Sequence, residues 1–168
     1  FEQILFEEDI WTELYQTLGK KATSLQILNL TDANLGAKRI DQLLNSLHRQ
    51  DRLQELKLKG NFFELQNVSS LIKLLKVNPC KAVDLRNTNL QPETVEKIAI
   101  ECRDHYKTSG KLLLQQLDLR GNTITGPHAE CLEKLNNDLN AGQKQVFLFD
   151  DAPLDKEEIK EPPCTILQ

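Results

Sequence analysis

The sequence lacks the signatures of several functional classes. Its 168 residues contain no P-loop, no dinucleotide-binding fingerprint and no G-x-S-x-G nucleophile motif. No apolar run approaches the roughly 18 residues that a membrane-spanning helix needs. Lys and Arg number 21 against 25 Asp and Glu, so there is no basic excess to favour nucleic acid. We therefore expect a protein that is not an enzyme, carries no cofactor, and binds neither nucleic acid nor a membrane.

Cysteine is also scarce, and the cysteines fall in separate segments, at Cys80, Cys102, Cys131 and Cys164. In a leucine-rich core this pattern is typical of reduced, buried thiols, which predicts a cytoplasmic protein. Two of the cysteines lie near histidines, in Cys102-x-x-His105 and His128-x-x-Cys131. The first pair falls late in one expected helix and the second early in the next, an offset of roughly 18 Å. Zinc ligands lie within about 2.3 Å of the ion, so we predict no metal site.

What the sequence has instead is a repeating leucine pattern. The pattern L-x-x-L-x-L-x-x-N/C-x-L starts at residues 25, 53, 80, 114 and 143, the last copy being weak. The step between copies is 27–29 residues, except for one of 34 residues whose surplus we place in 103–111. Steps of this length leave room for a strand, a turn and a full helix.

The asparagine position of the pattern decides how the chain leaves each strand. Asn61 and Asn122 occupy it in the second and fourth copies, where they can turn inward and bond the backbone. Ala33 and Thr88 occupy it in the first and third copies. Alanine cannot make these bonds and threonine makes them less well, so we expect looser turns at those two repeats.

Between the strands the apolar spacing becomes helical. The stripes consist of Ala37, Ile40, Leu43, Leu44 and Leu47; Leu65, Val68, Leu71, Ile72 and Leu75; Val95, Ile98, Ala99 and Cys102; and Leu132, Leu135 and Leu139. A shorter run, Ile10, Leu14, Tyr15 and Leu18 with Trp11 beside it, predicts a helix near the N-terminus. Since one unit cannot cover its own apolar face, the units must stack, with a parallel sheet on the concave side and helices on the convex side.

This organisation resembles the ribonuclease-inhibitor class of leucine-rich-repeat proteins over about residues 25–149. The resemblance implies an α/β solenoid, a short horseshoe that binds proteins. We divide the chain into an N-terminal capping or partial repeat at 1–24, four repeats with a degenerate fifth strand at 25–149, and an acidic, proline-containing tail at 150–168. The helices, rich in Gln, Asn and Lys, are similar in composition to effectors of intracellular bacteria, which would place the protein in a host cytosol.

The candidate binding residues lie between the buried leucines, on the concave face. They are Lys57, Lys59, Asp84, Arg86, Asp118, Arg120, Phe147 and Phe149. Strands about 4.8 Å apart put Lys59, Arg86 and Arg120 in one file, whose charge Asp84 and Asp118 can partly neutralise. One interpretation is a docking strip for an acidic partner, with the phenylalanines as anchors. The other is a solvated, self-paired charged sheet with both phenylalanines covered.

The function predicted from these features is that of a monomeric protein–protein interaction scaffold. It would bind a folded partner on its concave face and inhibit or regulate it, in the manner of a bacterial effector. The alternative is a structural or regulatory leucine-rich-repeat segment of a larger intracellular receptor-like protein. Phe1, Ile4 and Phe6 motivate this alternative, because they could form the strand of an additional repeat.

Overall fold

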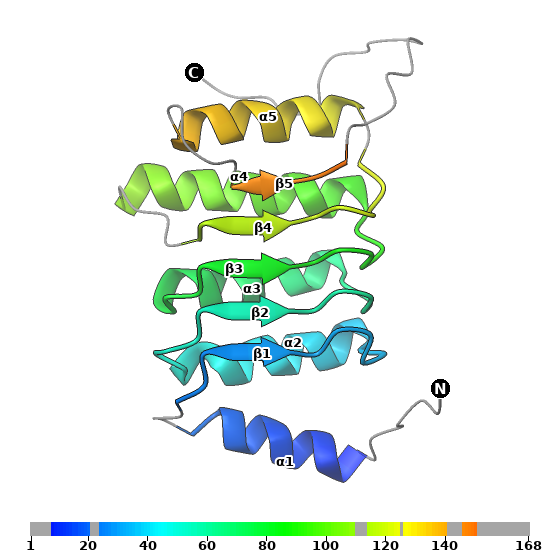
Figure 1. Ribbon diagram of the computed structural model, residues 1–168, viewed down its shortest axis with the longest axis vertical. Coiled ribbons are helices and arrows are strands. Elements are labelled where there is room, and N and C mark those ends of the chain that lie inside the picture. Colours follow the sequence, from blue (N-terminus) through cyan, green and yellow to red (C-terminus); the bar gives the residue numbers. More distant parts are fainter. Residues whose placement is uncertain (1–7, 21–23, 110–113, 125, 141–145, 151–168) are drawn as a thin grey trace.

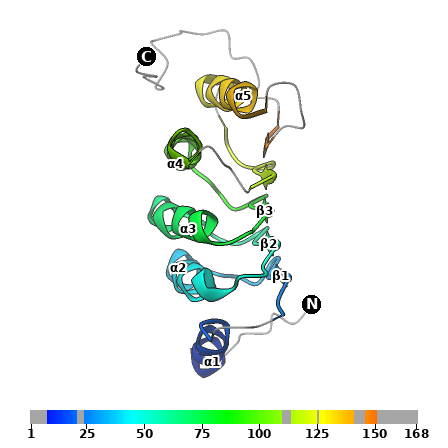
Figure 2. The same cartoon turned by 90° about the vertical axis from the view of Figure 1, so that its left-hand side faces the viewer.

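The computed structural model describes residues 8–20, 24–109, 114–124, 126–140 and 146–150. The elements are α1 (Glu8–Leu18), β1 (Ile27–Asn29), α2 (Ala37–Ser46), the 3-10 helix η1 (Leu47–Arg49), β2 (Glu55–Lys57), α3 (Leu65–Val77), β3 (Ala82–Asp84), α4 (Pro92–Ser109), β4 (Gln116–Asp118), α5 (Gly126–Asn140) and β5 (Phe147–Leu148). The strands form one parallel sheet in chain order, as predicted (Figure 1). The helices lie on one face of it (Figure 2). The other face, the open sheet face, carries no helix of the described chain.

The first four strands have the register that the leucine pattern predicts. Leu28 pairs with Leu56, Leu56 with Val83, and Val83 with Leu117. Because side chains alternate along a strand, these residues all point toward the helices. Leu56, Val83 and Leu117 are at most 1% exposed, whereas Leu28, at the end of the sheet, is only partly buried.

The predicted helical stripes pack against the inner face of the sheet. In the stripes of α2 to α5 every predicted residue is buried except Leu139, which is partly buried, and Leu65. Leu65 begins α3 and is 49% exposed. The surplus of the long step lengthens α4, which spans 18 residues and begins at Pro92, where the missing proline N–H costs the helix nothing.

Helix α1 packs against α2 through a face that is rotated from the predicted one. Trp11 is 3% exposed and belongs to the core, whereas Ile10 is 47% exposed. The Arg39 guanidinium lies 5.6 Å from the centre of the Trp11 ring. The Tyr15 hydroxyl donates to the Arg39 carbonyl oxygen at 3.2 Å. The ring of Trp11 therefore lies against the neighbouring helix, and Ile10 is not part of the packed stripe.

Asn61, at the exit of β2, bridges two repeats. Its side-chain nitrogen donates to the carbonyl oxygen of Leu58, in its own repeat, and to that of Leu30, in the preceding repeat, both at 2.8 Å. Its side-chain oxygen accepts the N–H of Leu35, also in the preceding repeat, at 2.9 Å. Asn61 is only 4% exposed, so these bonds satisfy backbone groups that water does not reach.

Asn122, at the exit of β4, does the same for the third repeat. Its oxygen accepts the N–H groups of Thr88 and Leu90 at 3.0 Å, and its nitrogen donates to the Leu85 oxygen at 2.8 Å. The Thr88 hydroxyl also donates to the Leu85 oxygen, at 2.6 Å, and Thr88 is fully buried. The exits of β1 and β3 are thus closed by the asparagine of the next repeat, and the expectation of looser turns there is wrong.

The fifth strand is offset by one residue from the predicted register. Phe147 pairs with Leu117, so it takes the inward position that the sequence suggested for Val146. The offset is set by Asn136 of α5, which is 5% exposed. Its side-chain oxygen accepts the N–H groups of Val146 and Phe147 at 3.1 and 2.8 Å, and its nitrogen donates to the Phe147 oxygen at 3.0 Å. A slip of one residue moves every side chain of a strand to the opposite face.

Candidate functional site

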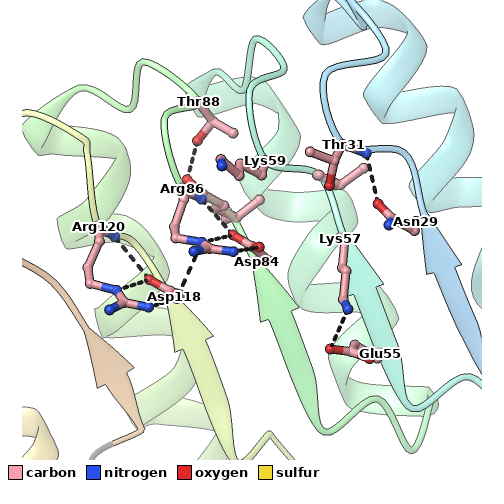
Figure 3. Close-up of polar contacts among 12 residues, drawn as sticks. Asn29, Thr31, Glu55, Lys57, Lys59, Asp84, Arg86, Thr88, Asp118 and Arg120 are labelled. Atoms are coloured by element: carbon pink, nitrogen blue, oxygen red, sulfur yellow. Dashed lines mark hydrogen bonds and ion pairs between the residues drawn. The ribbon is translucent and has the colours of Figure 1, made fainter.

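The predicted charged residues of β2 to β4 gather on the open sheet face. We name them the charged strip, which consists of Lys57, Lys59, Asp84, Arg86, Asp118 and Arg120. Figure 3 shows these side chains on three neighbouring strands and their exits. All of them except Lys59 line a hollow of about 210 Å³. Five of the six residues therefore share one hollow, and Lys59 follows β2 outside it.

Each arginine of the charged strip is held by the aspartate two residues before it. Arg86 donates from Nε to Asp84 Oδ1 at 2.9 Å and from Nη2 to Asp84 Oδ2 at 2.7 Å (Figure 3). Arg120 makes the same two-pronged contact with Asp118, at 2.9 and 2.6 Å. Arg86 Nε also lies 3.5 Å from Asp118 Oδ2, which links the two pairs. Bidentate pairs of this kind fix the plane of the guanidinium.

The same aspartates hold the backbone at the ends of their strands. Asp84 Oδ1 accepts the backbone N–H of Arg86 at 3.0 Å, and Asp118 makes the equivalent bond at 3.3 Å. Asn29 takes this place in the first repeat and accepts the N–H of Thr31 at 3.1 Å. These residues thus have a structural role that sequence reasoning missed, although Asp and Asn are typical of such local bonds.

Pairing also shifts the pKa values of Asp84 and of the two arginines. Burial raises the pKa of the Asp84 carboxyl, but the hydrogen bonds and charge of Arg86 outweigh burial and leave this pKa below its usual value. The bond to Asp84 raises the pKa of Arg86, and the bond to Asp118 raises the pKa of Arg120. Asp84 and both arginines are therefore charged at neutral pH.

The two lysines of the charged strip differ in their surroundings. Lys57 Nζ lies 3.2 Å from Glu55 Oε1. No carboxylate of the described residues lies within ion-pair distance of Lys59. At the other end, the charge of Asp150 acts on Arg120. With these neighbours the strip is close to neutral. Lys59 is its cation without an ion pair among the described residues, although its charge still acts on Asp84.

Phe147 and Phe149 do not lie on the open sheet face. Phe147 is fully buried, and Phe149 is partly buried against the same core. The burial of both phenylalanines follows from the register of β5, in which Leu148, between them, points outward. Their predicted placement as exposed aromatic anchors is wrong, so the charged strip alone remains as the candidate site.

The cysteines give no sign of a reactive centre in the part of the chain that the structure describes. Burial raises the pKa of the Cys80 thiol to about 11 and that of Cys102 to about 12, which disfavours the nucleophilic thiolate. Cys131 is disulfide-bonded, so the expectation of reduced thiols is wrong at this position, and Cys164 lies outside the described residues. No group of three His, Cys, Asp or Glu side chains within the described ranges could hold a metal.

No described helix is both long and apolar enough to cross a membrane.

Known proteins share the repeat and the fold. The family model described as Leucine Rich Repeat matches residues 113–135. No curated protein matches the sequence. The C-terminal domain of Caenorhabditis elegans tropomodulin has a TM-score of 0.67 at 11% identity, covering 86% of this chain and 84% of that one. Leiomodin-1 actin-binding site 2 has a TM-score of 0.66 at 11% identity, covering 84% of this chain and 79% of the other. By its sequence repeat and its fold, the chain is a leucine-rich-repeat protein.

Proposed function

We propose that the open sheet face is the concave side of a short horseshoe and that it binds a folded partner protein. The observation that carries the proposal is the charged strip, where two arginines are held in place by aspartates of their own strands. A side chain that is already fixed loses less conformational entropy when a partner binds it. The module would act by recognition, with no catalytic step of its own.

The arginines retain donors for a partner. Their bonds to aspartate use Nε and Nη2, which leaves Nη1 of each guanidinium available. The side chains of Arg86 and Arg120 are 38% and 48% exposed. Since Lys59 has no ion pair among the described residues, we infer that the partner has an acidic surface, with a carboxylate facing this lysine.

Two further features of the function are proposals of the same kind. We infer a monomer in the cytoplasm, or in a host cytosol if the protein is a secreted effector, that inhibits or regulates its partner. The alternative is a leucine-rich-repeat segment of a larger receptor-like protein. The partly buried Leu28 and the 55% exposed Ile27 of β1 favour this alternative, because a further strand would cover them.

Actin is the first partner to test, because the matched region of leiomodin-1 is described as an actin-binding site. The purified chain would be sedimented with actin filaments, and affinity capture from cytosolic lysate would show whether another protein binds. A variant Lys59→Glu reverses the charge of the strip's lysine that has no ion pair among the described residues. We expect it to weaken partner binding by about tenfold or more, through lost attraction and new repulsion.

The matched control is Lys73→Glu, which makes the same charge change at an exposed position on α3, on the helix side of the molecule. It should leave binding unchanged. A Lys59→Glu variant that is folded and keeps wild-type affinity for the partner would remove the charged strip from the interface. The same loss in both variants would show a general charge effect instead of a site.

A further inference from the structure

A second hollow lies at one edge of the molecule, away from the open sheet face. It is a groove of about 520 Å³, formed where the chain passes from β2 into α3 and from β3 into α4. These connections run along the right-hand edge in Figure 1. One wall is residues 62–66, and the other is Asn89, Gln91, Glu93 and Thr94. We name it the edge groove, and it shares no residue with the charged strip.

Two large apolar side chains that line the edge groove are exposed. Phe62 is 46% exposed and Leu65 is 49% exposed, and both line the groove. Phe63, between them in sequence, is 1% exposed and holds this turn to the core. A single exposed apolar side chain is ordinary on a protein surface. Two that line one hollow form a place where an apolar side chain of a partner can be buried.

The rim of the edge groove is acidic. Glu64 and Glu93 are exposed, and the lining contains no Lys, Arg or His. Glu64 is the N-cap residue of α3, and its carboxylate accepts a bond from the Gln66 amide at 2.9 Å. The N-termini of α3 and α4 each contribute about half a positive charge, which offsets only part of the two carboxylates.

We propose that the edge groove binds a segment of a partner protein that presents a large apolar side chain flanked by arginine or lysine. The apolar side chain packs on Phe62 and Leu65, and the flanking cations face Glu64 and Glu93. This charge preference is opposite to that of Lys59 on the open sheet face. The edge groove therefore does not depend on the concave-face function, and the two surfaces can be tested separately.

The test uses the 168-residue chain labelled with nitrogen-15 and two short synthetic peptides with the same pair of adjacent large apolar residues. One peptide is flanked by arginines and the other by glutamates. We expect the arginine-flanked peptide to shift the backbone amide resonances of residues 62–66, 89–91, 93 and 94, and to leave those of the charged strip in place. No shift in the groove, an equal response to both peptides, or shifts centred on the charged strip would overturn the proposal.

Variants then identify which contacts matter. Phe62→Ser should weaken binding of the arginine-flanked peptide by about tenfold. Val77→Ser is the matched control, because Val77 is 65% exposed at the other end of α3 and should not affect binding. Glu93→Gln should weaken binding by about two- to threefold at low salt and less at high salt. Equal losses in Phe62→Ser and Val77→Ser, or no loss in a folded Glu93→Gln protein, would contradict the proposed contacts.

Discussion

The strand exits after β2 and β4 are built differently from those after β1 and β3. The former have one residue with positive φ, a glycine followed by asparagine, at Gly60 and Gly121 (φ 73° in both). The latter have two residues with positive φ, all Asp or Asn, at Asp32, Asn34, Asn87 and Asn89 (φ 53–56°). Asp and Asn tolerate this conformation better than other residues with a side chain. The difference shows that the repeats come in pairs, in which one exit supports the other.

Contacts between neighbouring exits explain the pairing. The carboxylate of Asp32 occupies the space that a Cβ atom on Gly60 would need, and the side chain of Asn87 does the same at Gly121. In return, Asn61 bonds the backbone of the repeat that contains Asp32. Within a pair, therefore, the second repeat supplies the bonding side chain and the first repeat supplies the side chain that fills the space.

The largest effect expected from this comparison is that of Asn61→Ala. It would take away the acceptor of the buried Leu35 N–H and the side-chain donor of the Leu30 carbonyl, whereas the Leu58 carbonyl keeps the backbone N–H of residue 61. We expect it to lower the free energy of unfolding by about 2–4 kcal/mol. Thr88 occupies the position of Asn61 in the exit of β3, which is of the other kind. Thr88→Ala removes the hydroxyl bond to the Leu85 carbonyl and should cost about 1 kcal/mol, in addition to the cost of any small cavity that it leaves. Urea denaturation followed by circular dichroism measures both.

Asn45→Ala is the control for this pair, since Asn45 is exposed and bonds only Asp41. Its effect should stay within about 0.5 kcal/mol. If Asn61→Ala cost no more than Thr88→Ala, the two kinds of exit would not differ in the way described.

The next effect concerns Gly60→Ala. A Cβ atom here meets the Asp32 carboxylate, and the backbone is left-handed, so we expect a loss of about 1–3 kcal/mol. At Gly36, the N-cap of α2, an added Cβ meets nothing. Gly36→Ala loses a favoured capping residue but also restricts the unfolded chain, so its net cost should stay below about 1 kcal/mol. In a double-mutant cycle, Asp32→Gly should recover part of the Gly60→Ala loss. Strict additivity of the two changes would argue against the contact.

A smaller effect is expected at Asn34, which is exposed and has φ 54°. Asn34→Val should lower the free energy of unfolding by about 1–2 kcal/mol, because a β-branched side chain disfavours the left-handed region of backbone conformation. Asn34→Gly should be tolerated. Thr123 occupies the corresponding position after β4 with negative φ, so Thr123→Val should stay within about 0.5 kcal/mol. Equal costs for the two valine variants would mean that the backbone of both exits is the same.

The smallest effect is the pH dependence from Asp84. Its folded pKa lies below its usual value, so its contribution to stability is present above about pH 4 and is lost as the pH falls further. Asp84→Asn keeps the backbone bond, as Asn29 does in the first repeat, but loses the charge. We expect wild type to exceed this variant by less than about 1 kcal/mol at neutral pH. Thermal melts between neutral and acid pH should show that difference shrinking, and a constant difference would contradict the pairing.

Much of the fold could be predicted from the sequence because leucine or valine alternates with polar residues where the first four strands end. That alternation fixes which side of the strand faces the core. Val146 to Phe149 are all apolar, so the sequence there does not show which residues point inward. The register depends instead on Asn136 of the preceding helix α5. A contact of this kind cannot be deduced from spacing within the strand.

The residues of the charged strip could be predicted because they occupy equivalent positions in successive repeats. The partial neutralisation of the basic residues by Asp84 and Asp118 could be predicted in the same way. What could not be predicted was that each carboxylate also bonds the backbone at the end of its strand. The strand exits were misjudged for a related reason. Ala33 and Thr88 were considered within their own repeats, whereas the bonds come from Asn61 and Asn122 of the next.

The alternation of strand exits limits how this protein can change in length. Deleting or duplicating one repeat of about 28 residues would place two like exits next to each other. Two glycine–asparagine exits in succession would leave an empty space beside a glycine, and two of the other kind would leave buried backbone groups without a donor or acceptor. A designer who wishes to extend the binding surface should therefore insert modules of two repeats, cut after β2 or β4.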